Sequence, residues 1–253
     1  MADPDSSFPR RHARSRGFTL GRPRGFQVGA DGARVAFLRS AAGDDPVNRL
    51  WVLEVASGAE RLVADPATLL GDGAEDLPPE ERARRERARE RAGGIVAFAA
   101  DLDLTVASFA LAGRLFVTGL GDPDSQAREL PAGEAVLDPR VDPTGTRVAW
   151  VAGRALHVAE LDGSLAPRRL VGEDDPEVSW GLAEFLAAEE MDRSRGFWWS
   201  PDGRRLAVAR ADLRRVRRFH LTDPANPAVE PVALPYPAAG TDNAEVSLHV
   251  VDL

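Results

Sequence analysis

The sequence predicts an all-β fold, a partial β-propeller of about four blades of antiparallel strands with short helical insertions. Two observations lead to this prediction. A glycine-containing turn that runs straight into an alternating apolar strand recurs along the chain, and a second short strand follows each copy. The repeats are roughly 40–60 residues long with several strands each, which is typical of propeller blades.

The repeated turn predicts where the strands of each blade begin. Glycine adopts positive φ without strain, so the chain can reverse tightly before a strand starts. Short strands separated by turn residues at this density indicate antiparallel sheets. The copies occupy residues 30–37, 142–150 and 200–208; the strands that follow occupy 49–55, 155–161 and the region around 219–221; a weaker copy covers 95–98, 105–109 and 114–118.

The segments outside the repeats differ in composition. Residues 1–17 are polar and rich in Arg, Ser and Pro, which predicts a flexible N-terminal lead-in before one incomplete propeller domain over residues 18–253. The Pro and Ala residues of 224–240 predict a loop, after which residues 246–253 return to the alternation of a strand.

Residues 78–91 predict a helix inserted between blades. Pro78 and Pro79 suit a helix start, and acidic residues precede basic ones by four positions, as Glu81 precedes Arg85. Because the segment has no apolar face, we expect a solvated helix.

Composition excludes several classes of function. The net charge of −8 and the lack of basic stretches interleaved with aromatic residues argue against a nucleic-acid partner. The chain has no cysteine and its histidines show no metal-binding spacing, so we expect no disulfide, no metal site and no cofactor. No apolar run approaches the length of about 18 residues that a membrane span needs, and the N-terminus lacks the apolar core of a signal peptide. We therefore expect no membrane partner and a cytoplasmic location.

Residues 180–209 contain the candidate binding site. The first half has apolar residues at helical spacing, which predicts a short helix that carries two adjacent acids, Glu189 and Glu190. Gly196 breaks this pattern, and residues 197–199 predict a strand that enters a turn at 200–203. The positions of the predicted helical face are Leu182, Phe185, Leu186 and Glu189.

Two adjacent carboxylates favour the binding of a cation. Their negative charges repel each other, which makes it costly to bury both, and a positive charge between them removes that electrostatic cost. The cation could be Arg193, four residues after Glu189, or the ammonium group of a ligand. With Arg193 the arrangement is an ordinary solvated helical turn whose ion pair is worth only about 0.3–0.5 kcal/mol. Spacing alone leaves both interpretations open.

The same stretch resembles the double-glutamate segment of the dipeptidyl peptidase IV group within the prolyl oligopeptidase family of serine peptidases. The opening of the chain is also similar to the start of that family's propeller domain, so the resemblance covers nearly the whole chain. The residues that carry it are Ala183-Glu184-Phe185, Glu189-Glu190-Met191-Asp192-Arg193, Gly196 and Trp198-Trp199-Ser200-Pro201-Asp202-Gly203, and in the opening Arg16-Gly17-Phe18-Thr19-Leu20-Gly21 through Leu38-Arg39-Ser40.

The resemblance implies a role for the two acids. In that family adjacent glutamates bind the free α-amino group of a peptide substrate, so Glu189 and Glu190 are the candidate substrate-binding residues and Arg193 a candidate auxiliary residue. The family's activity is the release of N-terminal dipeptides from peptides with a free N-terminus. The resemblance implies the family's architecture, an eight-bladed propeller followed by an α/β-hydrolase domain that holds the catalytic Ser, Asp and His.

The catalytic residues of such a peptidase are not readable in this sequence. No serine has glycine at both −2 and +2, as the Gly-x-Ser-x-Gly of a hydrolase domain requires. The histidines, at positions 12, 157, 220 and 249, lie in the lead-in or in predicted strands, and no partner for them is readable. We therefore predict no catalytic residue here, a chain that is inactive alone, and a hydrolase domain that completes it in cis or in trans.

Two hypotheses follow. In the first, the chain is the propeller part of a dipeptidyl peptidase IV-like serine peptidase and contributes its amine-binding site. In the alternative, it is a non-catalytic propeller-like interaction module whose acidic helix is a surface feature or docks a partner. A Gly-x-Ser-x-Gly encoded beyond Leu253 would favour the first. Because unpaired strand edges attract one another, we also expect the chain alone to be weakly stable and to self-associate as a homo-oligomer.

Overall fold

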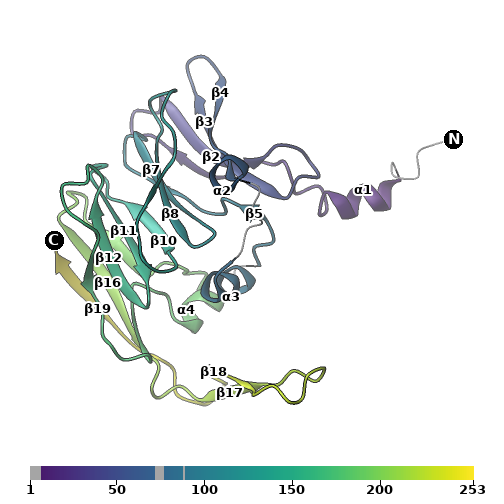
Figure 1. Cartoon of the computed structure of the whole chain (residues 1–253), viewed down its shortest axis with the longest axis vertical. Coiled ribbons are helices and arrows are strands. Elements are labelled where there is room, and N and C mark those ends of the chain that lie inside the picture. The colour runs from purple at the N-terminus through teal and green to yellow at the C-terminus, as the bar shows by residue number, and fades with distance from the viewer. Residues whose placement is uncertain (1–6, 72–76, 88) are drawn as a thin grey trace.

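The computed structural model describes residues 7–71, 77–87 and 89–253. Most of its strands form four sheets, which we call blades A to D in chain order, and two more form a separate arm. The blades follow one another around an arc that is open on one side, and helix α1 (Phe8–Arg14) extends away from blade A (Figure 1). The all-β partial propeller predicted from the sequence is confirmed.

Blades A, B and C share one topology, in which four successive strands pair as an antiparallel meander. In blade A an additional strand, β5 (Gly93–Gly94), pairs in parallel with β3. The strands of blade A are β1 (Arg24–Val28), β2 (Arg34–Ser40), β3 (Val47–Glu54) and β4 (Ala59–Ala64); those of blade B are β6 (Ala99–Ala100), β7 (Val106–Leu111), β8 (Arg114–Gly119) and β9 (Arg128–Leu130); those of blade C are β10 (Leu137–Val141), β11 (Arg147–Ala152), β12 (Ala155–Glu160) and β13 (Arg168–Val171).

Blade D departs from this topology because its first strand is divided. Strands β14 (Val178–Trp180) and β15 (Phe197–Trp199) both pair with β16 (Arg205–Asp212), each along a different part of it. On its other side β16 pairs along its whole length with β19 (Glu245–Asp252). The residues that divide the first strand, 181–196, contain the two candidate acids.

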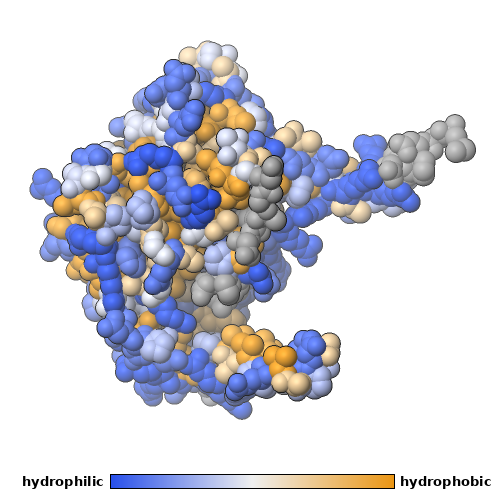
Figure 2. Space-filling view, viewed as in Figure 1, coloured by the Kyte–Doolittle hydropathy of each residue, from blue (hydrophilic) through white to orange (hydrophobic). Residues whose placement is uncertain are grey.

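The arm lies between β16 and β19 in the chain and consists of β17 (Arg218–Leu221) and β18 (Val232–Pro235). The prediction of a loop over 224–240 was therefore wrong for β18, whose four residues pair in register with β17. The arm projects from the foot of blade D, and apolar side chains gather on its surface (Figure 2).

The predicted glycine-containing turn joins the first two strands of blades A, C and D, and blade B has an equivalent turn without glycine, in which Leu104 takes a φ of +50°. In blades A to D the N–H at position 29, 101, 142 or 200 donates to the carbonyl five residues later, at 2.8–3.2 Å. In blade C this residue is the buried Asp142, whose carboxylate accepts from the N–H groups of Thr146 and Arg147, each at 2.7 Å. Two backbone N–H donors of a tight turn are thus satisfied by one buried side chain, which stabilises the turn.

Three apolar cores hold the arc together, one between each pair of neighbouring blades. Successive side chains of a strand point to opposite faces, so blades B and C bury both of their faces. The largest fully buried side chains include Phe109 in the A–B core, Trp150 in the B–C core and Phe197 in the C–D core. The position of blade D, and of the residues inserted into it, is therefore set by packing against blade C.

Helix α3 (Pro79–Arg87) forms within the predicted segment 78–91, of which residue 88 lies outside the described residues. The expectation of a solvated helix was wrong for Glu81 and Arg85, which are only 4% and 5% exposed. Burial by itself would raise the pKa of Glu81, but hydrogen bonds and charges from Arg84 and Arg85 outweigh it and leave that pKa below its usual value. Charged groups tolerate burial when they are paired in this way.

Two further helices are short. Helix α2 (Pro66–Leu70) begins after Asp65, whose carboxylate accepts from the N–H of Ala67. Helix α1 falls within the predicted lead-in 1–17, and of that lead-in residues 1–6 lie outside the described residues. Helix α4 (Phe185–Glu189) belongs to the segment inserted into blade D.

Candidate functional site

The candidate site is built on residues 181–196, which we call the excursion. Its two ends meet at a single residue of β16, Ala209. The carbonyl of Ala209 accepts from the N–H of Gly181 at 2.9 Å, and its N–H donates to the carbonyl of Gly196 at 2.8 Å. The chain therefore leaves the ladder and returns to it at the same point, so the excursion is inserted without displacing the strands on either side.

The excursion occupies nearly the position of a β-bulge in other blades. In β1 the pairing shifts between Arg24 and Gln27, and in β10 it shifts between Leu137 and Arg140. In both places the bulged strand advances three residues while its partner advances two, which leaves one residue unpaired. The excursion begins one ladder position further along the equivalent strand pair, opposite Ala209. It is thus an enlarged bulge at a place where the ladder is already interrupted.

Two glycines close the base of the excursion. A Cβ atom on Gly196 would lie 2.3 Å from the carbonyl carbon of Gly181 and 2.4 Å from the backbone nitrogen of Leu182, so no side chain fits there. Next to these glycines, Leu182 and Arg195 form an isolated antiparallel bridge. Leu182 therefore pairs with Arg195 and lies outside the helix, which begins at Phe185, so the predicted helical face was wrong for Leu182.

Helix α4 is short and depends on its cap. The carboxylate of Glu184 accepts from the N–H groups of Leu186 at 2.7 Å and Ala187 at 2.9 Å, which satisfies donors that a helix start leaves free. Ala187 is fully buried beneath the helix. Glu184 thus has a structural role, and the adjacent acids left for a ligand are Glu189 and Glu190 at the C-terminal end of the helix.

Glu189 is the last residue of α4 and Glu190 follows it as the C-cap, and both side chains are exposed. The helix lies on the concave side of the arc (Figure 1). Among the described residues, no hydrogen bond or ion pair engages either carboxylate. Both carboxylates are therefore accessible from solvent.

Arg193, which the sequence spacing offers as an ion-pair partner for Glu189, contacts other groups. The Nη1 of Arg193 donates to the carbonyl of Arg195 at 2.8 Å, and its guanidinium lies 5.9 Å from the centre of the Trp198 ring. The helix ends at Glu189, and the backbone N–H of Arg193 donates to the carbonyl of Ala187, so Arg193 lies past the last helical turn. The intrahelical ion pair considered from the sequence is not formed.

An aromatic contact from outside the excursion supports α4. The ring of Phe185, the first residue of α4, meets the ring of Tyr236 edge to face, with centroids 5.1 Å apart. Tyr236 follows the arm strand β18 and also lies 6.1 Å from the ring of Phe219 on β17. The base of the arm is therefore in contact with the acidic helix. No local pattern in the sequence signals this contact.

Charged residues from blade C and α3 approach the excursion. Asp138 sits in the bulge of β10 with φ of +47° and pairs with Arg140 at 2.7 Å. Burial lowers the pKa of Arg195, and the charge of Arg140 lowers it further, while Asp138 opposes both. The charge of Asp138 also acts on Arg84 of α3. The charge of Asp138 therefore acts on residues of both α3 and the excursion.

Clusters of metal-binding side chains and the contacts of His249 are the other places where a site could form. No cluster of three or more His, Asp or Glu side chains suited to a metal occurs in the part of the chain that the structure describes. The Nε2 of His249 lies 2.8 Å from the hydroxyl of Ser247 on β19, but the ring packs against Trp180 at 4.7 Å instead of a carboxylate. No described helix is long and apolar enough to cross a membrane.

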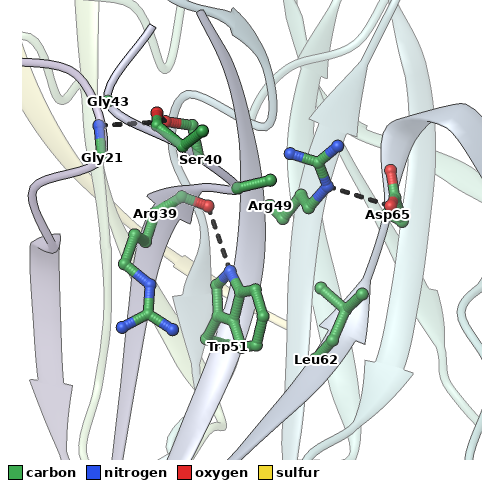
Figure 3. A pocket seen from close by; sticks show the side chains of 10 residues that line it. Gly21, Arg39, Ser40, Gly43, Arg49, Trp51, Leu62 and Asp65 are labelled. Atoms are coloured by element: carbon green, nitrogen blue, oxygen red, sulfur yellow. Dashed lines mark hydrogen bonds and ion pairs between the residues drawn. The ribbon is translucent and has the colours of Figure 1, made fainter. Parts of the chain in front are cut away.

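A hollow of about 640 Å³ lies on blade A and contains neither candidate acid. In Figure 3 the indole of Trp51 and the side chain of Leu62 line it, and the N–H of Trp51 donates to the carbonyl of Arg39 at 3.0 Å. Arg49 and Asp65 pair at 2.9 Å on its other side. The hollow and the acidic helix are separate features on different blades.

Comparison with known proteins identifies the family. Residues 111–253 match the family described as the Dipeptidyl peptidase IV (DPP IV) N-terminal region. The chain belongs to this family. The match covers more than half of the chain and includes the whole excursion, so the resemblance of residues 180–209 to this family is confirmed, whereas the opening residues 16–40 lie outside the match.

Several curated relatives carry matching names. A putative dipeptidyl aminopeptidase of Schizosaccharomyces pombe is 31% identical over 121 residues, which cover 44% of this chain and 15% of the relative. Venom dipeptidyl peptidase 4 of Apis mellifera is 33% identical over 101 residues, 37% of this chain and 13% of the relative. Dipeptidyl peptidase 4 of Sus scrofa is 27% identical over 115 residues, 44% of this chain and 15% of the relative. The chain therefore matches only a small part of these relatives' length.

Proposed function

We propose that this chain is the propeller portion of a dipeptidyl peptidase IV-like serine peptidase, and that Glu189 and Glu190 bind the free α-ammonium group of a peptide. One observation carries the proposal. Two adjacent exposed carboxylates stand on a capped helix whose base is closed by glycines, and no described side chain neutralises them. The names of the relatives agree with a peptide as the ligand.

The chemistry of the ligand suits the pair. The α-amino group of a peptide has a pKa of about 7.7–8.0, so it is mostly protonated at neutral pH. An ammonium group has hydrogens to share between two carboxylates, and hydrogen bonds between charged partners are roughly twice as strong as neutral ones. If the N-terminus is held at this place, the same number of residues always lies between it and the nucleophile of a hydrolase domain. That domain would then release dipeptides. The chain alone is proposed to bind without cleaving.

Binding to the chain itself tests the proposal. We expect the tripeptide Ala-Pro-Ala with a free N-terminus to bind saturably in isothermal titration calorimetry, and its N-acetylated form to bind at least about tenfold more weakly, because one charged hydrogen bond is worth about 1.5–3 kcal/mol. Glu189→Gln and Glu190→Gln should each weaken binding of the free peptide. Glu230→Gln, at an exposed glutamate before β18, is the matched control and should leave the affinity unchanged.

The proposal fails if acetylated and free peptides bind equally, or if the two glutamine variants bind the free peptide as the unchanged chain does. Failure of the unchanged chain to bind the free peptide at all also counts against it. A second arm uses pH. Affinity for the free peptide should fall as the pH rises through about 8, where the α-ammonium group loses its proton.

A further inference from the structure

Arg195, at the base of the excursion, is a partly buried cation without a partner. Among residues 7–71, 77–87 and 89–253, none forms a hydrogen bond or an ion pair with its guanidinium group. Arginine stays protonated in proteins, so it cannot escape the cost of burial by losing its charge. Since charged groups that leave water are usually paired, this side chain has an unused capacity to bind an anion.

The bridge at the base of the excursion fixes the side on which Arg195 lies. Arg195 pairs with Leu182, and side chains directly opposite each other in an antiparallel pair point to the same face. Leu182 packs against the C–D core, so Arg195 points toward blade C. The indole N–H of Trp199 donates to the carbonyl of Arg140 at 3.1 Å, which joins this part of blade D to β10. Arg195 is therefore held beside the bulge of β10.

The bulge of β10 does not neutralise this cation. Its carboxylate, Asp138, already pairs with Arg140 at 2.7 Å. Burial and then the charge of Arg140 lower the pKa of Arg195, and the weaker attraction of Asp138 does not offset them. Arg84, which also feels the charge of Asp138, is paired with Glu81 at 2.6 Å. Two guanidinium groups therefore share one carboxylate at this place, and a further anion beside them would relieve their repulsion.

We propose that Arg195 binds a carboxylate of the peptide whose ammonium group Glu189 and Glu190 hold, so that the site favours peptides with a negative charge close to their N-terminus. This inference rests on the proposed function. Arg195 follows Glu190 by five positions, so their Cα atoms lie at most about 18 Å apart. An extended tripeptide spans about 10 Å, which is within that limit. The carboxylate is therefore that of a short peptide's C-terminus or of an acidic side chain near its N-terminus.

The chemistry of the guanidinium group suits this ligand. Its N–H groups form a planar fork that matches the two oxygens of a carboxylate, and such charged pairs are stronger than neutral hydrogen bonds. The exposed Glu189 and Glu190 repel a carboxylate and attract an ammonium group. The acid pair at the end of α4 and the lone cation at the base of the excursion therefore hold a peptide with both charges in one direction.

Matched peptides test the inference on the chain itself by isothermal titration calorimetry. Ala-Pro-Ala is compared with its C-terminal amide, and the amide of Asp-Pro-Ala with the amide of Asn-Pro-Ala. In at least one pair we expect the member with the carboxylate to bind at least about fivefold more tightly, and the pair that responds identifies the source of the carboxylate. Arg195→Gln should remove this preference. Arg204→Gln, at an exposed arginine in the turn of blade D, is the matched control and should retain it.

Thermal stability without peptide gives a second measurement. Because the cation is unpaired within the chain, Arg195→Gln should leave the melting temperature unchanged or higher, whereas loss of an internal ion pair would lower it. The inference is overturned if neither carboxylate improves binding, if the preference persists in Arg195→Gln, or if this variant melts more than about 2 °C below the unchanged chain. N-terminal acetylation separates the two proposals. If acetylation weakens binding of Ala-Pro-Ala while the carboxylates make no difference, the ammonium site stands and the role of Arg195 is rejected.

Discussion

Replacing Gly196 by alanine should detach the acidic helix from its base. The added Cβ would lie 2.3 Å from the carbonyl carbon of Gly181 and 2.4 Å from both the carbonyl oxygen of Gly181 and the nitrogen of Leu182. All three neighbours are backbone atoms, so rotation of a side chain cannot relieve the overlap. Since ordinary contact begins at 3.4 Å, the two chain segments must separate by about 1 Å.

The cost of that separation follows from the contacts at this point. Overpacking a close-packed site costs about 1–3 kcal/mol. Separation also weakens the two hydrogen bonds that join Gly181 and Gly196 to Ala209, each worth about 0.5–1.5 kcal/mol. Together these terms lower the free energy of unfolding by about 2–6 kcal/mol. At about 2–4 °C of melting temperature per kcal/mol for a chain of this size, the shift is readily measured.

Two measurements test this prediction: the melting temperature and the rate of backbone amide hydrogen exchange. Gly43→Ala is the matched control, because a Cβ there meets only a backbone oxygen at 3.9 Å. We expect the melting temperature of Gly196→Ala to fall by at least about 4 °C relative to the control, with faster exchange of the Gly181 and Ala209 amides and weaker binding of free-amine peptides. Identical melts and identical exchange in the two variants would refute the steric argument for the glycines.

Three further substitutions test other parts of the structure. Asp142→Ala removes the buried carboxylate that accepts from two backbone N–H groups and should lower the free energy of unfolding in urea by about 2–4 kcal/mol. Asp31→Ala, at an exposed residue with one such bond, should cost less than about 1 kcal/mol; equal losses would contradict this. Burial lowers the pKa of His157, so the unfolded chain binds its proton more readily and the free energy of unfolding should fall as the pH decreases from about 7 to about 5. His157→Phe should make the free energy of unfolding depend less on pH in this range, and an unchanged dependence would exclude His157 as its source. Tyr236→Leu should weaken binding of free-amine peptides about two- to tenfold by removing the ring that contacts Phe185, whereas Tyr236→Phe should not; equal affinities of both variants would count against this support.

Local chemistry in the sequence determined the blades and the presence of the acidic helix. The turn that contains Asp142 and the alternating strand after it are encoded within about ten residues, because tight turns and strand faces depend on near neighbours. The same holds for Glu189 and Glu190, whose adjacency is a property of the chain itself. Gly196 interrupts the helical pattern for the same reason.

Tertiary structure alone decided which of these residues meet. Gly196 is required because it touches Gly181, and α4 is supported because Tyr236 returns from the arm to contact Phe185. Glu81 is buried although its helix has no apolar face, since paired arginines offset its charge. Contacts between residues far apart in the chain depend on how whole blades pack, and periodicity reports only the faces of single strands and helices. The sequence by itself therefore determined the repeating strands and the pair of acids, and packing between blades decided how that pair is held.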